Sequence, residues 1–347
     1  MSIVAKRITD PKHFILYHGG GCTDGLAAAY AGWHKFREQS EAYPVKYGEA
    51  LPDMPLTADS EIYVVDFSLN LKTLMALSQH CKKVQVIDHH QSAYDDFIYD
   101  AIVQYTYYAH PLYQASCRYL MKHCKAYYAH VCETLGICPP IFDMSKSGAY
   151  LTWEYFHPDL PVPEIIQYVS DRDLWQFKHE QTRAALEGVY FSGLKDNMAY
   201  WHRLVNDKHP LEECIEKGRS ILKYRQTLID GYKTGDRLRI LAIDNLTVAI
   251  YNTSDFIDEI AEMLYTHPYL NIDYTLSYYI RQDGTAKVSF RTQQYSIHPL
   301  LKKLGFTRGI DLVPIAKAWN GGGHRTSAGA SLSYEQTLIL LDLLNKK

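Results

Sequence analysis

The chain has 347 residues, 36 of them basic and 39 acidic, and its formal net charge is −3. This length exceeds that of one ordinary hydrophobic core, so two domains are expected. The small acidic surplus argues against a long groove for double-stranded nucleic acid, which would need a basic surface, and leaves small phosphorylated substrates open.

Hydropathy and cysteine content indicate the part of the cell in which the protein is expected. No run of residues approaches the roughly 18 apolar positions of a membrane span, and the first residues lack the apolar segment of a signal peptide. The seven cysteines are an odd number, which favours reduced thiols over a disulfide framework. We therefore expect a cytoplasmic protein with no membrane partner.

The first recognisable elements alternate between strand and helix. Residues 14–17 are apolar and predict a short buried strand, and the alanine-rich residues 23–36 predict a helix. Residues 61–68 and 82–88 predict two further strands, with a helix over residues 71–80 between them. Strands and helices that alternate with short connections predict a parallel sheet covered on both faces, so the fold class is α/β.

Polar side chains follow each predicted strand, where a sheet of this kind binds its ligands. These side chains are His18, Asp24, Asp66, Asp88, His89 and His90. Carboxylates that lie side by side repel one another unless a positive charge lies among them. Oxygen-rich sites with some imidazole suit Mn²⁺ or Mg²⁺, and two such ions roughly 3.5–4 Å apart are a recurrent device for phosphoester hydrolysis. The pattern therefore predicts a metal site at this edge.

Residues 105–140 have the length and composition of a helical insertion. They contain four cysteines and three histidines, namely Cys117, Cys124, Cys132, Cys138, His110, His123 and His130. A zinc site is one interpretation, although no CxxC pair is present. Apolar positions from Tyr113 to Leu135 recur three and four residues apart, which is typical of an amphipathic helix, so core packing is the favoured interpretation.

A connecting helix is predicted within residues 207–235. Pro210 suits the first helical position, Glu212 and Glu213 suit the first turn, and Gly231 suits the end. Residues 236–347 then predict a second α/β domain, with strands over 237–243, 246–252, 273–280 and 286–292 and a helix over 256–266. The pair Asp283 and Gly284 is a hairpin signal.

A run of glycines, Gly321, Gly322 and Gly323, precedes His324 in the second domain. Three glycines let backbone N–H groups approach an anion closely, and a helix starting after them would add its dipole. The run therefore predicts a phosphate-binding loop, with a plain turn as the alternative.

Five motifs occur in the order found in the DHH phosphoesterase superfamily with its C-terminal associated domain, which the chain resembles over most of its length. They are the turn from His18 to Asp24, VVDFS at Asp66, IDHH at Asp88 to His90, SDRDLW at Asp171 and GGGHRTSAGAS from Gly321. The resemblance implies a DHH catalytic domain over residues 1–206, a connecting helix, a smaller C-terminal α/β domain with the GGGH motif, and an active-site cleft between them.

The resemblance also implies roles for individual residues. His18, Cys22 and Asp66 would hold one metal ion, and Asp24, Asp66, His89 and Asp171 the other, so that Asp66 bridges the two. Asp173 is the nearby rival of Asp171. Asp88 would orient His89, because carboxylates that hydrogen-bond a ligating histidine fix its tautomer. His90, Arg291 and His324 would contact the substrate phosphate.

Cys22 departs from the family pattern, which has an aspartate at this position. A thiolate is a soft ligand that prefers zinc or iron-like ions to Mg²⁺, so the first site is predicted to be weak, differently loaded or empty. A buried cysteine that only packs is an equally favoured interpretation. Mn²⁺ is the favoured metal, as two ions or as one if the Cys22 site is empty, and Mg²⁺, Co²⁺ and Zn²⁺ are alternatives.

The predicted activity is metal-dependent hydrolysis of phosphoester bonds in small nucleotides, such as short oligoribonucleotides, pAp and linear or cyclic dinucleotides. One alternative is an exopolyphosphatase-like hydrolase, and another is a degenerate nucleotide-binding module without turnover. The expected partner is a small phosphorylated nucleotide substrate, with no long double-stranded nucleic acid and no membrane. A homodimer stays open.

Overall fold

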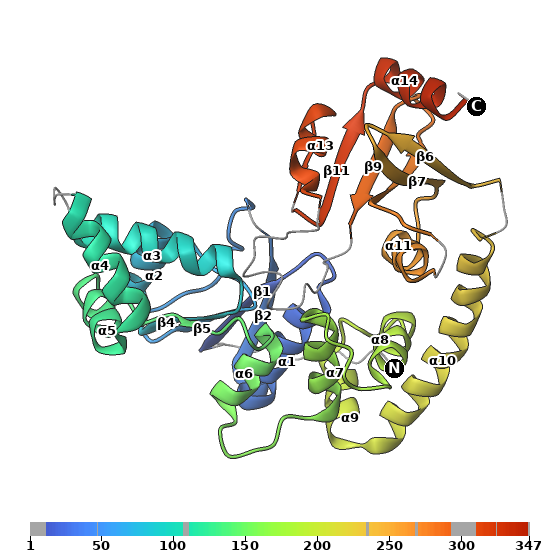
Figure 1. Cartoon of the computed structure of the whole chain (residues 1–347). Coiled ribbons are helices and arrows are strands. Elements are labelled where there is room, and N and C mark those ends of the chain that lie inside the picture. Colours follow the sequence, from blue (N-terminus) through green and yellow to red (C-terminus); the bar gives the residue numbers. More distant parts are fainter. Residues whose placement is uncertain are drawn as a thin grey trace. The chain divides into compact units, whose positions relative to one another are not determined.

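The computed structural model describes residues 12–46, 48–106, 111–233, 236–267, 270–292, 310–323 and 325–345 (Figure 1). The chain divides into two compact units, Met1–Leu222 and Lys223–Lys347. The division falls inside the long helix α10, Lys208–Asp230. Among the described residues, no helix combines the length and apolar character that crossing a lipid bilayer requires.

The first unit is built on a parallel sheet of five strands, in the order β2-β1-β3-β4-β5. The strands are β1 (His13–His18), β2 (Ser40–Val45), β3 (Glu61–Val65), β4 (Lys83–Asp88) and β5 (Ile141–Phe142). Every pairing in this sheet is parallel. The predicted α/β class is confirmed, and the carboxyl ends of all five strands meet at one edge.

Both faces of this sheet are covered, because successive side chains of a strand point to opposite faces. In β1, Ile15 packs into one core cluster and Phe14 and Leu16 pack into another, and all three are fully buried. Each such side chain stabilises the fold by about 1.5–3 kcal/mol on burial. The first cluster includes α1 (Thr23–Phe36), and the second includes α2 (Leu71–His80).

The remaining helices of the first unit contribute residues to the same two clusters, except for the short η1. They are the 3₁₀ helix η1 (Arg37–Gln39), α3 (Gln91–Tyr105), α4 (Pro111–His123), α5 (Lys125–Thr134), α6 (Gly148–Phe156), α7 (Glu164–Asp173), α8 (Thr182–Phe191) and α9 (Met198–Asn206). Of these, α3 follows β4 directly, and α6 contacts α1 extensively. The N-termini of α1 and α6 thus lie near the carboxyl edge of the sheet, where the site is described below.

The insertion differs from the predicted single helical stripe. Two helices, α4 and α5, meet at Cys124, which has extended backbone angles and caps α5. Cys117 and Val131 are buried as predicted for core packing. Tyr113 and Leu120 are exposed, because the face that α4 turns to the core runs through Cys117 and Met121 instead. Among the described residues, no three histidine or cysteine ligands of the insertion lie together, and His110 lies outside the described residues.

The second unit is built on a mixed sheet in the order β10-β11-β9-β8-β7-β6. Its strands are β6 (Leu238–Ile243), β7 (Leu246–Asn252), β8 (Tyr274–Ile280), β9 (Ala286–Arg291), β10 (Gly322–Gly323) and β11 (Ser327–Leu332). Its helices are α11 (Ile257–Thr266), α13 (Leu312–Ala318) and α14 (Tyr334–Asn345). The predicted smaller α/β domain is confirmed as a fold, including the hairpin between β8 and β9, where Gly284 has a φ of 79°.

Three histidines pack near the C-terminal end of α1. His34 Nδ1 lies 3.4 Å from His157 Nε2, and the His34 and His202 rings are 5.7 Å apart. Burial, followed by the neighbouring His157 and Arg37, lowers the pKa of His34 to about 4. Burial also lowers the pKa values of His157 and His202. All three side chains are therefore neutral at pH 7.

This cluster predicts a loss of stability in acid. A histidine with a lowered folded-state pKa stabilises the fold fully above its unfolded pKa of about 6.5, and this contribution declines as the pH falls toward about 4. We expect the free energy of unfolding from urea titrations to decrease between pH 6.5 and 4.5, and to decrease less in His34→Gln. Equal slopes for both proteins would contradict this account of the cluster.

Candidate functional site

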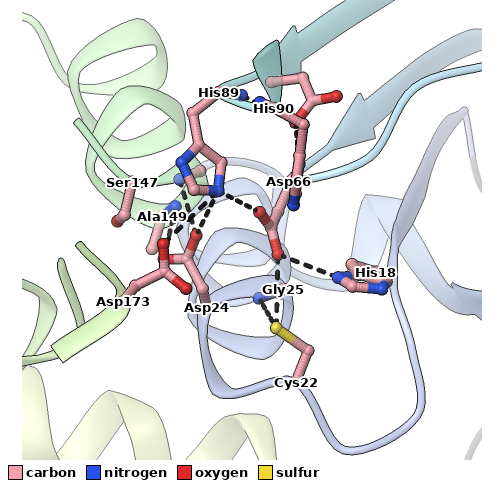
Figure 2. A network of polar contacts seen from close by, with 12 residues as sticks. His18, Cys22, Asp24, Gly25, Asp66, His89, His90, Ser147, Ala149 and Asp173 are labelled. Atoms are coloured by element: carbon pink, nitrogen blue, oxygen red, sulfur yellow. Dashed lines mark hydrogen bonds and ion pairs between the residues drawn. The ribbon is translucent and has the colours of Figure 1, made fainter. Parts of the chain in front are cut away.

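Three strands of the parallel sheet deliver polar side chains to one edge. His18 ends β1, Asp66 follows β3, and Asp88 ends β4 with His89 next to it. Figure 2 shows the polar side chains from these strand ends converging with Asp24 of α1. The predicted convergence therefore occurs, and it follows from the parallel pairing, which puts every strand end on the same side.

Asp66 lies at the centre of this group and is 1% exposed. One carboxylate oxygen, Oδ2, accepts a hydrogen bond from Cys22 Sγ at 3.5 Å and lies 3.7 Å from His18 Nδ1. The other oxygen, Oδ1, lies 3.1 Å from His89 Nε2. Asp66 has a φ of 52°, in the left-handed region that a non-glycine residue rarely adopts and that is often retained at functional sites.

Asp24 is held by the first residues of α6. Its two carboxylate oxygens accept backbone N–H groups from Gly148 at 2.7 Å and Ala149 at 3.1 Å, as Figure 2 shows for the labelled residues. These are donors that the start of a helix leaves without an internal partner. Gly148 and Ala149 therefore hold the Asp24 carboxylate in place, and the carboxylate in turn accepts two N–H groups at the N-terminus of α6.

Two glycines allow this close approach of backbones. A Cβ on Gly148 would lie 2.4 Å from the Asp66 Cβ, and a Cβ on Gly25 would lie 2.2 Å from the His18 carbonyl oxygen. Neither space can be opened by moving a flexible side chain, because the nearest atoms belong to backbone or to the first side-chain carbon. Glycine at both positions is thus a condition for bringing α1, α6 and the strand ends together.

His89 points its Nε2 atom at three carboxylates, as Figure 2 shows. Besides Asp66, these are Asp173 Oδ2 at 3.5 Å and Asp24 Oδ2 at 3.7 Å. Asp173 is the last residue of α7 and is partly exposed. Its position gives the group a carboxylate from a fifth element of the fold, after β1, β3, β4 and α1.

Asp171 does not reach this group, although the sequence favoured it over Asp173. Its carboxylate accepts backbone N–H groups from Lys178 at 2.8 Å and His179 at 3.0 Å, and also the Thr182 hydroxyl. Both of its oxygens therefore hold the turn that leads into α8. We correct the proposed ligand set accordingly and place Asp173 in it instead of Asp171.

Asp88 orients His90, whereas the sequence assigned it to the His89 ring. Its Oδ1 atom accepts a hydrogen bond from the His89 backbone N–H at 2.7 Å and lies 2.7 Å from His90 Nδ1. Its Oδ2 atom accepts the Ser68 hydroxyl. The reason is local: His90 occupies the N-cap position of α3 without capping it through its side chain, and its ring instead turns back to Asp88. The hydrogen bond to Asp88 raises the pKa of His90 above its ordinary value.

The carboxylates of this group share negative charge in a buried place. Burial, and then the charges of Asp66 and Asp173, raise the pKa of Asp24 well above its ordinary value. Burial also raises the pKa of Asp173, against the opposing effect of His89. Burial alone would raise the pKa of Asp66, but the imidazoles of His18 and His89 hold it below its ordinary value. Such opposed shifts among close carboxylates are typical of functional sites.

Cys22 has two roles in the structure. Its Sγ atom accepts the Gly25 backbone N–H at 3.5 Å, so it caps α1, and its S–H donates to Asp66. Burial, and then the charge of Asp66, raise the pKa of the Cys22 thiol to about 12. Without a cation the side chain is thus a neutral thiol. A cation bound beside it would favour the thiolate.

The donor set fits divalent cations. Three clusters have ligand atoms within 4.8 Å of one another: His18 with Cys22 and Asp66; Asp24 with His89 and Asp173; and Asp66 with Asp88, His89 and His90. Asp66 Oδ1 is buried and has His89 Nε2, at 3.1 Å, as its near polar neighbour, without a well-aligned hydrogen bond among the described residues, so a cation beside it would satisfy this oxygen. Carboxylate and imidazole donors are those that Mn²⁺ and Mg²⁺ accept.

Arg291, one of the predicted phosphate contacts of the second unit, has other partners. Arg291 forms an ion pair with Asp258 of α11 and donates to the Phe290 carbonyl at 2.9 Å. Gly321 is required by packing, because a Cβ there would lie 2.1 Å from the Gly329 oxygen, whereas a Cβ on Gly322 would meet nothing.

The glycine run itself forms a strand, which differs from the loop and helix start expected there. Gly322 and Gly323 form β10, which pairs with β11 at the edge of the sheet. His324 lies outside the described residues. The glycine run thus contributes an edge strand, and the next element among the described residues is the strand β11 and not a helix.

Comparison with known proteins gives relatives of low sequence identity. No family model matches the chain. It is 23% identical over 340 residues to the uncharacterised protein R106 of Acanthamoeba polyphaga mimivirus, an alignment that covers 93% of this chain and 68% of that protein.

Two solved structures are similar over most of their length. One is the pGpG-specific phosphodiesterase PggH from Vibrio cholerae, with a TM-score of 0.51 and 11% identity over 96% of this chain and 97% of that chain. The other is the DHH domain of a protein described as a member of a family of ribosomal proteins, with a TM-score of 0.51 and 12% identity over 97% of this chain and 87% of that chain. The chain therefore has the fold of DHH-domain proteins, which confirms at the level of the fold the resemblance that its motifs carry.

Proposed function

We propose that this chain is a metal-dependent phosphoesterase that hydrolyses phosphoester bonds of small nucleotides. The observation that carries the proposal is the position of Asp66, whose two oxygens face two separate clusters of ligand atoms. A carboxylate shared in this way is what a pair of bridged cations requires. The similarity in fold to a protein described as a pGpG-specific phosphodiesterase supports the same reaction class.

The ligand set in this proposal has two parts that share Asp66. His18, Cys22 and Asp66 Oδ2 would hold one divalent cation, and Asp24, His89, Asp173 and Asp66 Oδ1 would hold a second. When bound, such cations supply Lewis-acid stabilisation of the phosphoryl oxygens and activate water for attack at phosphorus. Mn²⁺ is the favoured ion, because six of the seven side-chain donors in this set are oxygen or nitrogen atoms.

His90 is the residue that we place against the substrate phosphate. Its Nδ1 atom is engaged with Asp88, and its ring is 34% exposed, so its Nε2 atom can donate to a phosphoryl oxygen. The hydrogen bond to Asp88 raises the pKa of His90 and so favours the cationic form. Asp88 is a positioning residue in this scheme, because it is fully buried and acts through the His90 ring.

A phosphate-binding role of the second unit remains part of the proposal. Arg291, the glycine run and His324 would bind a terminal phosphate of the substrate. A guanidinium can donate two parallel hydrogen bonds to a phosphate. At Arg291 such a phosphate would compete with Asp258, which already pairs with the guanidinium.

The proposed function is tested by identifying products. Metal-stripped protein would be incubated with pAp, linear and cyclic dinucleotides and polyphosphate, with Mn²⁺, Mg²⁺, Co²⁺ or Zn²⁺ added, and the products identified by mass spectrometry. We expect Mn²⁺-stimulated release of mononucleotides. Turnover of polyphosphate alone would favour the exopolyphosphatase alternative, and tight nucleotide binding without turnover at any metal would favour a binding module.

The Cys22 position predicts a change in metal preference. Cys22→Asp supplies an oxygen ligand and keeps a good helix cap, so we expect activity with Mn²⁺ and Mg²⁺ to rise relative to activity with Zn²⁺ and Co²⁺. Cys22→Ser is the matched control, because it keeps the cap and supplies no charged ligand. The measurement is the ratio of initial rates across the four ions. An unchanged ratio in Cys22→Asp would mean that the thiol caps and packs without touching a metal.

A further inference from the structure

A cavity of about 530 Å³ lies in the first unit, close to Asp66. Its walls come from the residues that follow β2, from the loop between β3 and α2, and from α3. The size falls within the roughly 300–1,000 Å³ typical of small-molecule sites. All of its lining residues belong to the first unit, and none of them is a proposed metal ligand.

The cavity shares a wall with the proposed metal centre. Phe67 and Ser68 line it and come directly after Asp66 in the chain. The Ser68 hydroxyl donates to Asp88 Oδ2 at 2.5 Å, and the His18 ring is stacked against Phe67 with centroids 6.4 Å apart. The left-handed backbone at Asp66 turns the chain here, and the next two residues, Phe67 and Ser68, contact both the metal group and the cavity. A ligand held in the cavity would therefore lie next to a phosphate at Asp66.

The chemistry of the lining excludes a second phosphate as its occupant. The accessible apolar lining comes from the half-buried Leu51, Leu69 and Ala93, because Phe67 and Phe97 belong to the core and are only 4% and 6% exposed. Lys46 is already paired with Glu49 at 3.3 Å, and Asp96 and Asp100 have no hydrogen-bond or ion-pair partner among the described residues. The surplus charge is negative and would repel a phosphate. It suits a flat, uncharged ring that presents N–H donors.

We propose that this cavity binds a nucleobase of the substrate, with Leu51, Leu69 and Ala93 against the ring and Asp96 or Asp100 accepting its N–H groups. This inference rests on the proposed function and makes it more specific, because a base subsite selects nucleotides over inorganic polyphosphate. Base selection here would come from the first unit alone.

The test compares ligands that share a phosphate and differ in the base. In calorimetric titrations of the full chain with Mn²⁺, we expect AMP or GMP to bind at least tenfold more tightly than ribose 5-phosphate. Ala93→Leu fills the cavity from α3 and should reduce this ratio to about one. Ala126→Leu, at an exposed position of α5, is the matched control and should leave it unchanged. Asp96→Asn with Asp100→Asn alters only exposed side chains and should lower the ratio at least threefold.

Equal affinity for the nucleotides and ribose 5-phosphate would overturn the inference, and so would an unchanged ratio in both cavity variants or a failure of all three ligands to bind. The titrations need no turnover. The protein could thus bind AMP or GMP more tightly than ribose 5-phosphate and yet hydrolyse no phosphodiester with any metal. That result would contradict the proposed function and still support a base-binding cavity, so the two failures can be told apart.

Discussion

Asp66→Asn is expected to lower the Mn²⁺-dependent kcat for a dinucleotide by more than a hundredfold. An asparagine presents one oxygen and no charge, so it cannot serve both clusters of ligand atoms that Asp66 now faces. Loss of a residue that merely supports a metal ligand typically costs about 10–100-fold, and a shared ligand should exceed that. The measurement is the rate of product release under saturating substrate.

The fold itself should survive this change. Asparagine has nearly the same shape, and its neutral amide removes the repulsion with Asp24 and Asp173. We expect the melting temperature without metal to stay within a few degrees of wild type, and the upward shift on adding Mn²⁺ to vanish, because a ligand stabilises a protein only as far as it binds. Near-wild-type turnover in Asp66→Asn would refute the bridging role.

The substitutions Asp173→Asn and Asp171→Asn should have opposite consequences. Asp173 lies 3.5 Å from His89, so its loss should weaken Mn²⁺ binding and reduce turnover at least tenfold with little effect on stability. Asp171 accepts two backbone N–H groups and the Thr182 hydroxyl, so an amide there leaves a buried donor unmatched at a cost of about 1–3 kcal/mol. Metal affinity in Asp171→Asn should be unchanged.

Two measurements on each variant separate these outcomes, namely the free energy of unfolding from urea titration and the Mn²⁺ dissociation constant from calorimetry. Thr182→Val is a control for the turn, because it removes one of the same hydrogen bonds and touches no candidate ligand. If Asp171→Asn failed to bind Mn²⁺ while Asp173→Asn still bound it, Asp171 would be the metal ligand, as first inferred from the sequence.

The sequence predicted the central strands of the first sheet and missed its edges. The strands β1 and β3 contain continuous apolar runs, β4 is apolar apart from the buried Gln85 and its two ends, and segments of this kind are easily recognised. The edge strand β2 begins with Ser40 and Glu41 and contains Pro44, which edge strands tolerate and which hides the pattern. Only the parallel pairing of β2 with β1 reveals it as a strand.

Most of the candidate site could also be predicted, because its residues follow directly from strand ends. The choice between Asp171 and Asp173 could not be. Two residues apart on a helix, they point about 200° apart, so only one can face the metal group. The face that α7 turns toward the metal group depends on how the helix packs, and the two-residue spacing of the aspartates does not indicate it. The partner of Asp88 was missed for a similar reason, since the turn into α3 decides whether His89 or His90 comes back over the carboxylate.

The most direct test of the central claim is to locate the cations. Crystals grown with Mn²⁺ would be measured at a wavelength where manganese scatters anomalously, and the anomalous difference map would be calculated for the first unit. We predict a peak within coordination distance of Asp66 Oδ1, His89, Asp24 and Asp173, and a second peak between Asp66 Oδ2 and His18 if the Cys22 site is loaded. A map without any peak beside Asp66, from crystals in which the side chains of this group are clearly ordered, would contradict the account.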